Sequence, residues 1–595
     1  MSSNDEVKPN IRIPGLWFMG GCLIAALGIY FFSGSALSSG VIATEVFLTI
    51  IGLFVFGSTR YELDKNALTY GAVLLIGATF ATGWTPQSSP TELIHHYLLS
   101  LHGLDELFHA DTMLFILGLT FFVAVVAQSR ILESVSFAVL QKNKGRILPT
   151  IAILTAVVAL LSGILDGVSM IGLMIRTVVI ILFLAKTKEG PIIYAVIVST
   201  VITTVCGMWL AYGEPPNLIM KANLHPDLTN SFFLRYCLPV AIGSYFIVYL
   251  NLRKRLGKQK VSIETLDILD LHTADVRFLQ ASRHGEVLTP IEFVEGKKEL
   301  MGAHIETILP RLHKGEPLGK ALVDEKIPKE VRKKLMGEFI SEDLADTLDQ
   351  HYIDLAAGHQ REHPKSLAKI ALTLKNVRKE RVRSQQIAGL SFIPFIGLLI
   401  WHAIDHRIPL FYASFSGFAV ALIGIFKFPK TRKLALKEAF HEYKEYLFLF
   451  PLFFSITLLQ KSGFFDQMSG WLHNGIEHLG TALVALIQFT GAVFLSALLD
   501  NNVVADFASR ALHGLELNVL HIFAMAQIAG YAVGGCWTHI GSAQSVVAFA
   551  FIKKEINGKY TPFQWIKAIT PIILEISILM VVVVYAEAKL MHFLQ

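Results

Sequence analysis

The sequence predicts an all-α polytopic membrane protein made of two inverted repeats with re-entrant hairpins and broken helices, plus a helical cytoplasmic insert. Hydrophobic residues make up 53% of the 595 residues and charged residues only 17%, a composition that excludes an ordinary soluble globular protein. Long apolar runs alternate with short polar loops, and short motifs recur at a nearly constant offset. The net charge of +5 is small for this length, so we expect no nucleic-acid binding.

Several apolar runs reach or exceed the ~18–20 residues with which a helix crosses the hydrocarbon core. The first run has no small-residue cleavage site and further runs follow it, so we interpret it as an anchor rather than a cleaved signal. Other segments carry a glycine, a proline or a charge partway along, which favours hairpins or broken helices beside a cavity. The long runs cover 16–32, 40–58, 69–82, 109–128, 190–212, 232–251, 387–401, 408–426, 445–460 and 568–587, and the interrupted segments cover 148–165, 168–185, 479–499 and 503–552.

Two motifs occur twice in the same order. Ser162-Gly-Ile-Leu-Asp166 recurs as Ser496-Ala-Leu-Leu-Asp500 at an offset of 334 residues. The segment 213–217 corresponds to 541–545 at an offset of 328. Such a steady offset predicts an internal duplication. The chain then divides into an N-terminal membrane half with an extra first helix, a polar insert and a C-terminal membrane half, which cover 1–251, 252–385 and 386–595.

Loop charges predict how these parts are oriented. The segment 252–385 holds 25 of the 52 lysine and arginine residues, so the positive-inside rule places it in the cytoplasm. The loop 83–108 has no lysine or arginine and is expected outside. Basic loops on both sides of the first hairpin then predict that it enters from inside and the second from outside. Two halves inverted in this way are typical of secondary transporters, whose sites lie at the repeat interface.

Asp166 and Asp500 occupy equivalent positions in apolar surroundings. An ionised carboxylate in hydrocarbon costs about 2.5–3.5 kcal/mol even on the lenient insertion scale, and a bound cation, a proton or water lowers that cost. Burial also raises the proton affinity of a carboxylate, so a proton and a metal cation can compete for one site. Each aspartate could instead cap a half-helix or pair with a basic neighbour.

Polar and helix-breaking residues surround these acids. Asn501 and Asn502 follow Asp500 and offer amide oxygens to a hard cation, whereas Gly167 follows the first aspartate. We therefore predict that the sodium site at Asp500, Asn501 and Asn502 is the stronger one. The paired prolines of the segment 213–217 must break a helix and leave carbonyls free for a ligand, unless the motif is a tight turn at the membrane surface.

Two arginines repeat with the aspartates. Arg176 follows Asp166 by ten residues, as Arg510 follows Asp500. Ten helical residues span ~15 Å, so neither pair touches within one straight helix. We interpret both arginines as snorkelling to the membrane surface, and a role in binding a substrate anion stays open.

Three further titratable residues are weaker candidates. Glu575 lies inside the last apolar run, where a carboxylate could carry a proton or accept a bundle-facing hydrogen bond. His402 and His406 have the spacing of a zinc pair, although no third ligand is evident. A membrane-embedded metal enzyme or sensor built on them and the insert is the competing class of function.

At these motifs the chain resembles the ion transporter superfamily, which includes NhaD-type sodium/proton antiporters, arsenite permeases of the ArsB type and divalent-anion/sodium symporters. The stretch from Ser496 to Asn501 is similar to that family's hairpin-tip motif, and Gly213-Glu-Pro-Pro-Asn217 is close to its Gly-Asp-Pro-Pro-Asn motif. The resemblance covers roughly 109–251 and 444–588. It implies a homodimer with an outer scaffold and a transport domain that moves like an elevator.

The chain also departs from the family pattern. Gly167 stands where asparagine is expected, Met208 and Leu210 replace small hydroxyl residues, and Ser545 stands where asparagine is usual. Carboxylates occupy the hairpin tips, where a dicarboxylate symporter of the family would have Ser-Asn-Thr. This difference favours cation/proton exchange.

The resulting hypothesis is a sodium/proton antiporter in a bacterial inner membrane, with no enzyme activity and no cofactor besides the transported sodium and protons. Sodium or lithium, protons and membrane lipid are the expected partners. An oxyanion or organic-acid carrier that uses Arg176 and Arg510 is the alternative. The candidate ion- or substrate-binding residues are Ser162, Asp166, Gly213, Glu214, Pro215, Pro216, Asn217, Ser496, Asp500, Asn501, Asn502, Thr538, Gly541, Ser542 and Ser545.

Overall fold

The structure is a computed structural model of the chain. Within the described residues, its regular elements are helices apart from one parallel pair of two-residue strands, β1 (Ile11–Arg12) and β2 (Tyr61–Glu62), and an isolated antiparallel bridge between Arg146 and Lys260. The predicted all-α class is therefore confirmed. The structure describes residues 11–33, 37–58, 61–84, 89–129, 131–165, 167–185, 187–261, 294, 301–314, 318–328, 382–405, 407–444, 446–499 and 501–594.

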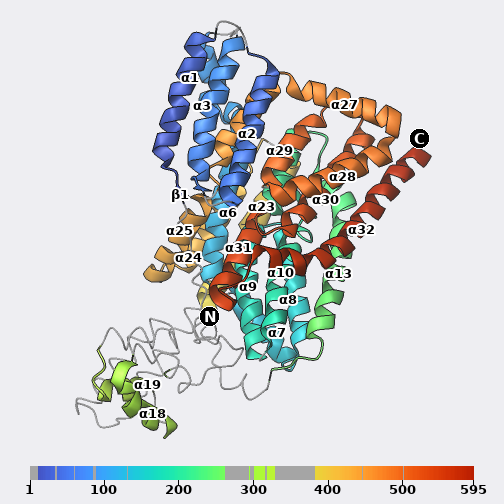
Figure 1. Ribbon diagram of the computed structural model, residues 1–595. Helices are drawn as coiled ribbons and strands as arrows, with labels where there is room; N and C mark the ends of the chain where they lie inside the picture. Colours follow the sequence, from blue (N-terminus) through green and yellow to red (C-terminus); the bar gives the residue numbers. More distant parts are fainter. Residues whose placement is uncertain are drawn as a thin grey trace, which may run out of the picture.

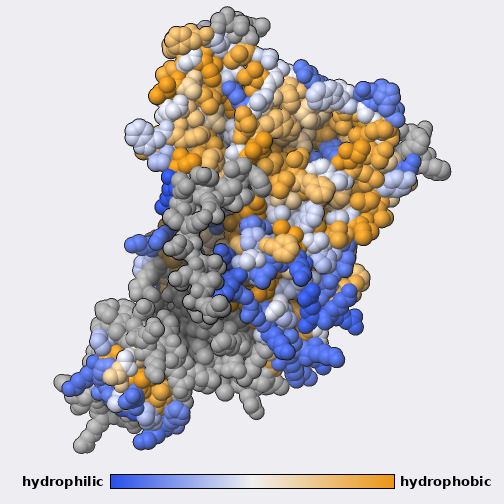
Figure 2. All heavy atoms as spheres, viewed as in Figure 1, coloured by the Kyte–Doolittle hydropathy of each residue, from blue (hydrophilic) through white to orange (hydrophobic). Residues whose placement is uncertain are grey.

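Within these residues, eight helices are long and apolar enough to cross a membrane, or up to nine if the bent pair at 431–479 is one span. The last helix, α32 (Pro562–Leu594), shows the pattern most clearly. Leu574, Ile578 and Val582 are each more than half exposed and recur every four residues, so they form one apolar stripe. Figure 2 shows such apolar surface over much of the molecule, with hydrophilic side chains gathered at the end where α7 (Ile131–Lys142) lies. The chain is a multi-pass membrane protein.

Three helices precede the first predicted repeat and form a separate group, drawn in blue in Figure 1. They are α1 (Gly15–Phe32), α2 (Ser39–Ser58) and α3 (Lys65–Gly83). α1 and α2 both pack on α3, and α3 packs on α26 (Leu449–Lys461). Short helical segments then lead to the first half: α4 (Pro90–Leu93), η1 (Ile94–Leu98) and α5 (Leu101–Phe108).

The two halves have the same order of elements. Each has a first helix of the core, a connecting helix, two helices joined at a hairpin tip, a long helix, an unwound stretch, a short helix and a final span. This order agrees with a duplication, while the inversion of the halves stays a prediction. The first half consists of α6 (Ala110–Gln128), α7, α8 (Ile147–Ser162), α9 (Gly167–Leu184), α10 (Glu189–Thr204), η2 (Ala211–Gly213), α11 (Pro215–Asn223), α12 (Asn230–Phe232), η3 (Phe233–Cys237) and α13 (Leu238–Leu256). The second half consists of α26, α27 (Phe464–Leu479), α28 (Thr481–Leu498), α29 (Asn501–Ala511), α30 (Leu517–Trp537), α31 (Ala543–Phe551), η5 (Ile552–Ile556) and α32.

Helices between the halves attach to α6 or belong to the insert. α24 (Phe411–Gly424) and α25 (Pro429–Lys444) pack on α6, and α23 (Phe392–Ile404) packs on α24. The described part of the insert contains η4 (Gly302–His304), α18 (Ile305–His313) and α19 (Leu318–Asp324). Arg311 on α18 forms ion pairs with Asp324 and Glu325.

The halves interlock rather than stand side by side. α11 of the first half packs on α29 of the second, and α31 of the second packs on α9 and α10 of the first. α10 also contacts α30. The unwound stretch of each half therefore lies among helices of the other half, where repeat-built transporters place their sites.

Two glycines bring the backbones of α28 and α30 together. Gly530 and Gly534 lie four residues apart on one face of α30, the small-residue spacing that permits close helix contact in membranes. A Cβ added at residue 534 would lie 2.2 Å from the Val493 carbonyl oxygen. A Cβ at residue 530 would lie 2.5 Å from the Ala492 Cβ.

Gly534→Ala is therefore expected to destabilise the fold by about 1–3 kcal/mol, because the two backbones must move apart. The thermal unfolding temperature of the purified protein in detergent measures this effect. Gly491→Ala is the matched control, because it lies on α28 and a Cβ there meets nothing within 4 Å. Equal melting temperatures for the two variants would contradict the close contact.

Candidate functional site

The first unwound stretch follows α10. That helix ends at Thr204, and α11 begins at Pro215 after an unwound stretch and a short 3-10 turn. Pro215 and Pro216 occupy the first helical turn, where the missing amide hydrogens would have no helical partner. Residues 211–221 are all buried. The predicted break is present, and it is buried in the core of the protein.

The end of α8 lies directly on this stretch. A Cβ added at Gly213 would lie 1.8 Å from the Ser162 carbonyl oxygen, and one at Gly163 would lie 2.0 Å from Trp209 Nε1. Trp209 Nε1 also donates a hydrogen bond to the Ala159 carbonyl oxygen at 3.3 Å. The glycines are required here because no side chain fits between the hairpin tip and the unwound backbone.

The second unwound stretch is built in a similar way. α30 ends at Trp537, α31 begins at Ala543, and a Cβ at Gly541 would lie 2.7 Å from the Ser496 carbonyl oxygen. In each half, therefore, a glycine of the unwound stretch lies against the end of the first hairpin helix. The contacts are Ser162 with Gly213 and Ser496 with Gly541, which are the pairs of positions related by the sequence repeat.

Hydroxyl groups bind backbone carbonyls of α30 and α28 around this second break. Thr538 Oγ1 donates to the Ala497 carbonyl, Ser496 Oγ to that of Tyr531 at 2.9 Å, and Ser545 Oγ to that of Gly535 at 2.9 Å. Ser542 Oγ accepts the Ser545 amide at 3.2 Å and so caps α31. A hydroxyl that donates in this way keeps lone pairs with which to bind a cation.

A carboxylate and an amide join the two unwound stretches. Gln544 Nε2 lies 2.9 Å from both Glu214 Oε1 and Oε2. Glu214 is 2% exposed, and it precedes the first turn of α11, while Gln544 lies in the first turn of α31. A Cβ at Gly167, the first residue of α9, would lie 2.3 Å from Glu214 Oε1. The glycine that replaces the family's asparagine is therefore the residue that leaves room for Glu214. We call this place the Glu214 crossing.

Asn217 holds the first unwound stretch in place. Its Nδ2 donates to the Leu210 carbonyl at 3.1 Å and to the Met208 carbonyl at 3.4 Å. Tyr531 on α30 donates its hydroxyl hydrogen to Asn217 Oδ1. The predicted ligand thus serves to satisfy carbonyls that the break exposes, as buried backbone requires.

The aspartates Asp166 and Asp500 lie outside the described residues, as does His406. Their neighbours are described: Gly167 lies at the Glu214 crossing, and Asn501 and Asn502 begin α29 as buried residues. The sodium site predicted at Asp500, Asn501 and Asn502 therefore stays a prediction.

The two arginines have different surroundings. Arg176 is exposed on α9. Arg510 is buried, and its Nε donates to Asp506 Oδ1 at 2.9 Å. The interpretation of Arg510 as a snorkelling residue is wrong, because Asp506 one helical turn before it supplies a buried partner.

Glu575 and His402 also have partners in the structure. Glu575 is exposed on α32 and accepts a hydrogen bond from Asn251 Nδ2 at 2.7 Å. His402 Nδ1 lies 2.7 Å from the Ile408 carbonyl oxygen. Across the described residues, no group of three His, Cys, Asp or Glu side chains is placed to hold a metal ion.

Sequence reasoning missed several residues of the core. Gln544 lies inside the repeated motif and corresponds to no acid or amide that would reveal its partner. Tyr531 lies in a helix whose pattern indicates only burial. The Asp506–Arg510 pair has a visible signal, because opposite charges four residues apart in an apolar helix face the same side.

Gly213→Ala is expected to abolish or strongly reduce function and to lower the melting temperature, because Ser162 cannot move away without opening the hairpin tip. Gly190→Ala on α10 is the matched control, since a Cβ there meets nothing within 4 Å. Thermal unfolding in detergent compares the two. A Gly213→Ala protein as stable as the control would show that the tip does not contact the unwound stretch.

Two comparisons with known proteins found matches to this chain. A solved structure, that of the YdaH transporter from Alcanivorax borkumensis with its unusual topology, is similar at 15% sequence identity. The match covers 92% of this chain and 97% of that one, with a TM-score of 0.41, a level that does not define the fold. None of the curated proteins matches the chain.

A family model gives the stronger result. The model of the CitMHS family, described as citrate transporters, matches residues 51–514, which is more than half of the 595-residue chain. The match begins in α2 and extends beyond α29, so it includes Glu214 and both hairpins. The chain is a secondary transporter and belongs to the citrate transporter family.

Proposed function

We propose that this transporter exchanges sodium or lithium for protons across a bacterial inner membrane, as NhaD-type antiporters do. The observation that carries the proposal is Glu214, a buried carboxylate at the point where both unwound stretches meet. Intramembrane carboxylates beside broken helices are the usual place for a coupling ion in secondary transporters.

The chemistry at this point suits competition between a cation and a proton. Gly167 packs against Glu214, and Asp166, the residue before it in the sequence, stays the predicted second acid of the site. Two ionised carboxylates in a low dielectric repel each other, and either a proton or a metal cation relieves the repulsion. Free lone pairs of hydroxyl and carbonyl oxygens from the unwound stretches would complete the ligands of a hard cation.

The buried basic groups favour a cation over an anion as cargo. Arg510 is already neutralised by Asp506, and Arg176 is exposed. Lys221 is buried and stacks over the Tyr212 ring, with Nζ 4.9 Å from the ring centroid. An anion at the Glu214 crossing would meet the Glu214 carboxylate.

The second candidate is a carrier of citrate or a similar carboxylate. The name of the family supports it directly. The structure adds that α9, α11 and α31 all begin at the Glu214 crossing, and helix N-termini attract negative charge. At this crossing the Glu214 carboxylate is itself the negative charge that the helix N-termini attract. We therefore favour a cation as the cargo.

Further expectations complete the proposal. The resemblance in sequence implies a homodimer and an elevator-like movement of the hairpins and broken helices. The basic clusters at both ends of the insert 252–385 favour a cytoplasmic location for it. Asp500, Asn501 and Asn502 would bind the cation, and Asp166 with Glu214 would assist or carry the proton. We expect neither an enzyme activity nor a cofactor.

Liposomes with an acid interior and a pH-sensitive dye test the proposal. Sodium or lithium added outside should collapse the pH gradient, while potassium should be less effective. Glu214→Gln should slow the collapse by about 10- to 100-fold, because a hydrogen bond or ligand contact to a charged group is worth about 1.5–3 kcal/mol. Asp500→Asn should have a similar effect, and Glu477→Gln, on the exposed surface of α27, should not.

A parallel assay with radiolabelled citrate separates the two candidates. Uptake of citrate that depends on a sodium or proton gradient, without collapse of the pH gradient by sodium alone, would contradict antiport and support the carboxylate carrier. Equal rates for Glu214→Gln and Glu477→Gln would remove Glu214 from the transport site.

A further inference from the structure

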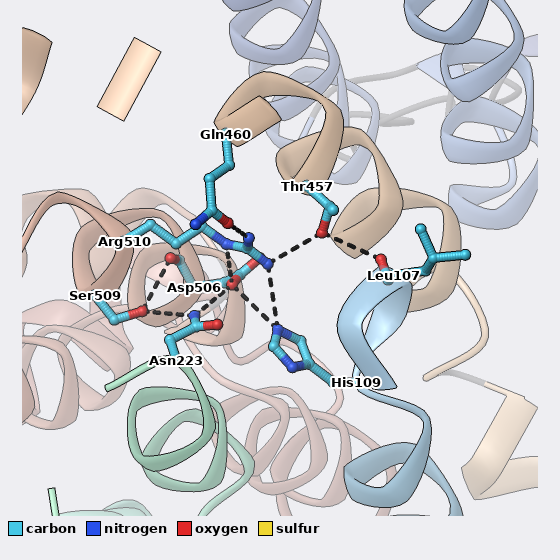
Figure 3. A network of polar contacts seen from close by, with 8 residues as sticks. All are labelled: Leu107, His109, Asn223, Thr457, Gln460, Asp506, Ser509 and Arg510. Atoms are coloured by element: carbon cyan, nitrogen blue, oxygen red, sulfur yellow. Dashed lines mark hydrogen bonds and ion pairs between the residues drawn. The ribbon is translucent and has the colours of Figure 1, made fainter. Parts of the chain in front are cut away.

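A second buried polar cluster connects α29 to three other elements and shares no residue with the Glu214 crossing (Figure 3). We call it the α29 cluster. Asp506, Ser509 and Arg510 belong to α29, whereas His109 immediately precedes α6. Its other members lie on α11 and α26, so the cluster comprises His109, Asn223, Thr457, Gln460, Asp506, Ser509 and Arg510.

Most donors and acceptors in the cluster have only one possible role. Asn223 Nδ2 donates to Asp506 Oδ1 and to Ser509 Oγ, both at 2.7 Å. Ser509 Oγ donates a hydrogen bond to the Asp506 carbonyl oxygen at 3.0 Å. Thr457 Oγ1 donates to the Leu107 carbonyl at 3.1 Å and accepts from Arg510 Nη2 at 3.2 Å. Arg510 also donates from Nη1 to Gln460 Oε1.

His109 is the member whose role is not determined by its partners. Its Nε2 lies 3.4 Å from Arg510 Nη2, which can only donate, and 3.5 Å from Asp506 Oδ1, which accepts. A neutral ring with the hydrogen on Nδ1 accepts from Arg510. A protonated ring cannot accept from Arg510 and donates to Asp506 instead. The two distances are nearly equal. A neutral ring with the hydrogen on Nε2 would also donate to Asp506, so only the neutral ring with the hydrogen on Nδ1 accepts from Arg510.

Charge makes the two forms unequal. His109 is 6% exposed, Asp506 is fully buried and Arg510 is 5% exposed. Asp506 and Arg510 neutralise each other, so a proton on His109 adds an uncompensated positive charge next to the guanidinium. Asp506 Oδ2 is buried and has no hydrogen-bond partner within the described part of the chain, which leaves the carboxylate able to take one more donor.

The other charged groups on the elements around His109 are engaged elsewhere. Asp105 accepts the Asp111 amide at 3.0 Å, Asp111 accepts the amides of Leu410 and Phe411, and Glu106 pairs with Lys461 at 2.8 Å. Lys221 on α11 lies over the Tyr212 ring. The titratable and charged groups on α5, α6, α11, α26 and α29 are His102, Asp105, Glu106, Asp111, Lys221, Lys461, Asp506 and Arg510.

The cluster lies where α29 meets its neighbouring helices, so a proton bound there can affect how α29 is held. α29 is the second helix of a hairpin, and it packs mainly on α11 and α30 and also contacts α26. His109 connects it to the start of α6. His109 forms the junction of α5 and α6 with a left-handed φ of 55°, so its ring is carried by a sharply bent backbone. Its ring also packs edge-on against Phe453 of α26, with the centroids 5.2 Å apart.

We propose that His109 is a proton-binding site that controls how α29 is held to α26 and to the junction of α5 and α6. The neutral ring with its hydrogen on Nδ1 accepts from Arg510 and keeps the hairpin helix in place. Protonation withdraws that acceptor and places two positive groups side by side, which loosens α29. This inference goes beyond the proposed function and holds for a cation or a carboxylate as cargo.

Hydrogen–deuterium exchange of the full-length protein in lipid nanodiscs tests the site without a substrate. Exchange of the α29 amides is compared at about pH 5.5 and about pH 8, on either side of the ~6.5 at which histidine titrates in model peptides, after correction for the intrinsic rate. We expect at least ~3-fold faster corrected exchange at the lower pH for the wild type, because opening is local. His109→Gln should remove this difference.

Two control variants separate a proton effect from a structural one. His473→Gln, on an exposed position of α27, should keep the wild-type difference. Thr457→Val removes a contact of Arg510 without a titratable group, so it should speed exchange at both pH values and keep the difference. If His109→Gln elutes as an aggregate, His109→Asn takes its place. A wild type with no pH effect, or a His109 variant that keeps it, would overturn the proposal.

Discussion

The fold depends on the need to satisfy polar groups that two broken helices bury in the membrane. Breaking α10 and α30 frees carbonyls that neither lipid nor a regular helix can satisfy. Asn217 and Ser545 bind carbonyls at the two breaks, and Ser496 and Thr538 bind carbonyls of α30 and α28 beside the second break. Gln544 reaches Glu214 from the other half of the chain. A transporter that kept these helices whole would avoid the problem but would have no polar site.

Glycine makes that solution possible. Gly163 and Gly213 allow the end of α8 to lie on one unwound stretch, Gly541 allows the end of α28 to lie on the other, and Gly167 leaves space for Glu214. The same residue type therefore explains the tight packing and one of the departures from the family pattern. A side chain at Gly167 would exclude the carboxylate that we place at the centre of the function.

The membrane class, the position of both breaks and the hairpins could be predicted from the sequence, because hydropathy and helix-breaking residues act locally. The partner of Glu214 could not, because Gln544 is 330 residues away and its type suggests no ion pair. Arg510 shows a different limit. The repeat relates Arg510 to Asp500, ten residues before it, but its partner is Asp506. A spacing of four residues lets Asp506 contact Arg510 within one helix. His109 lies in a bend that no periodic pattern marks.

The central claim is that Glu214 carries a proton that is released when the cation binds, and a measurement of proton release on cation binding tests it most directly. Purified protein in weakly buffered detergent solution is titrated with sodium chloride while a dye reports the pH, with choline chloride as the ionic-strength control. We predict a saturable release of protons by sodium that is greatly reduced in Glu214→Gln. No release from the wild type, or the same release from the variant, would contradict the account.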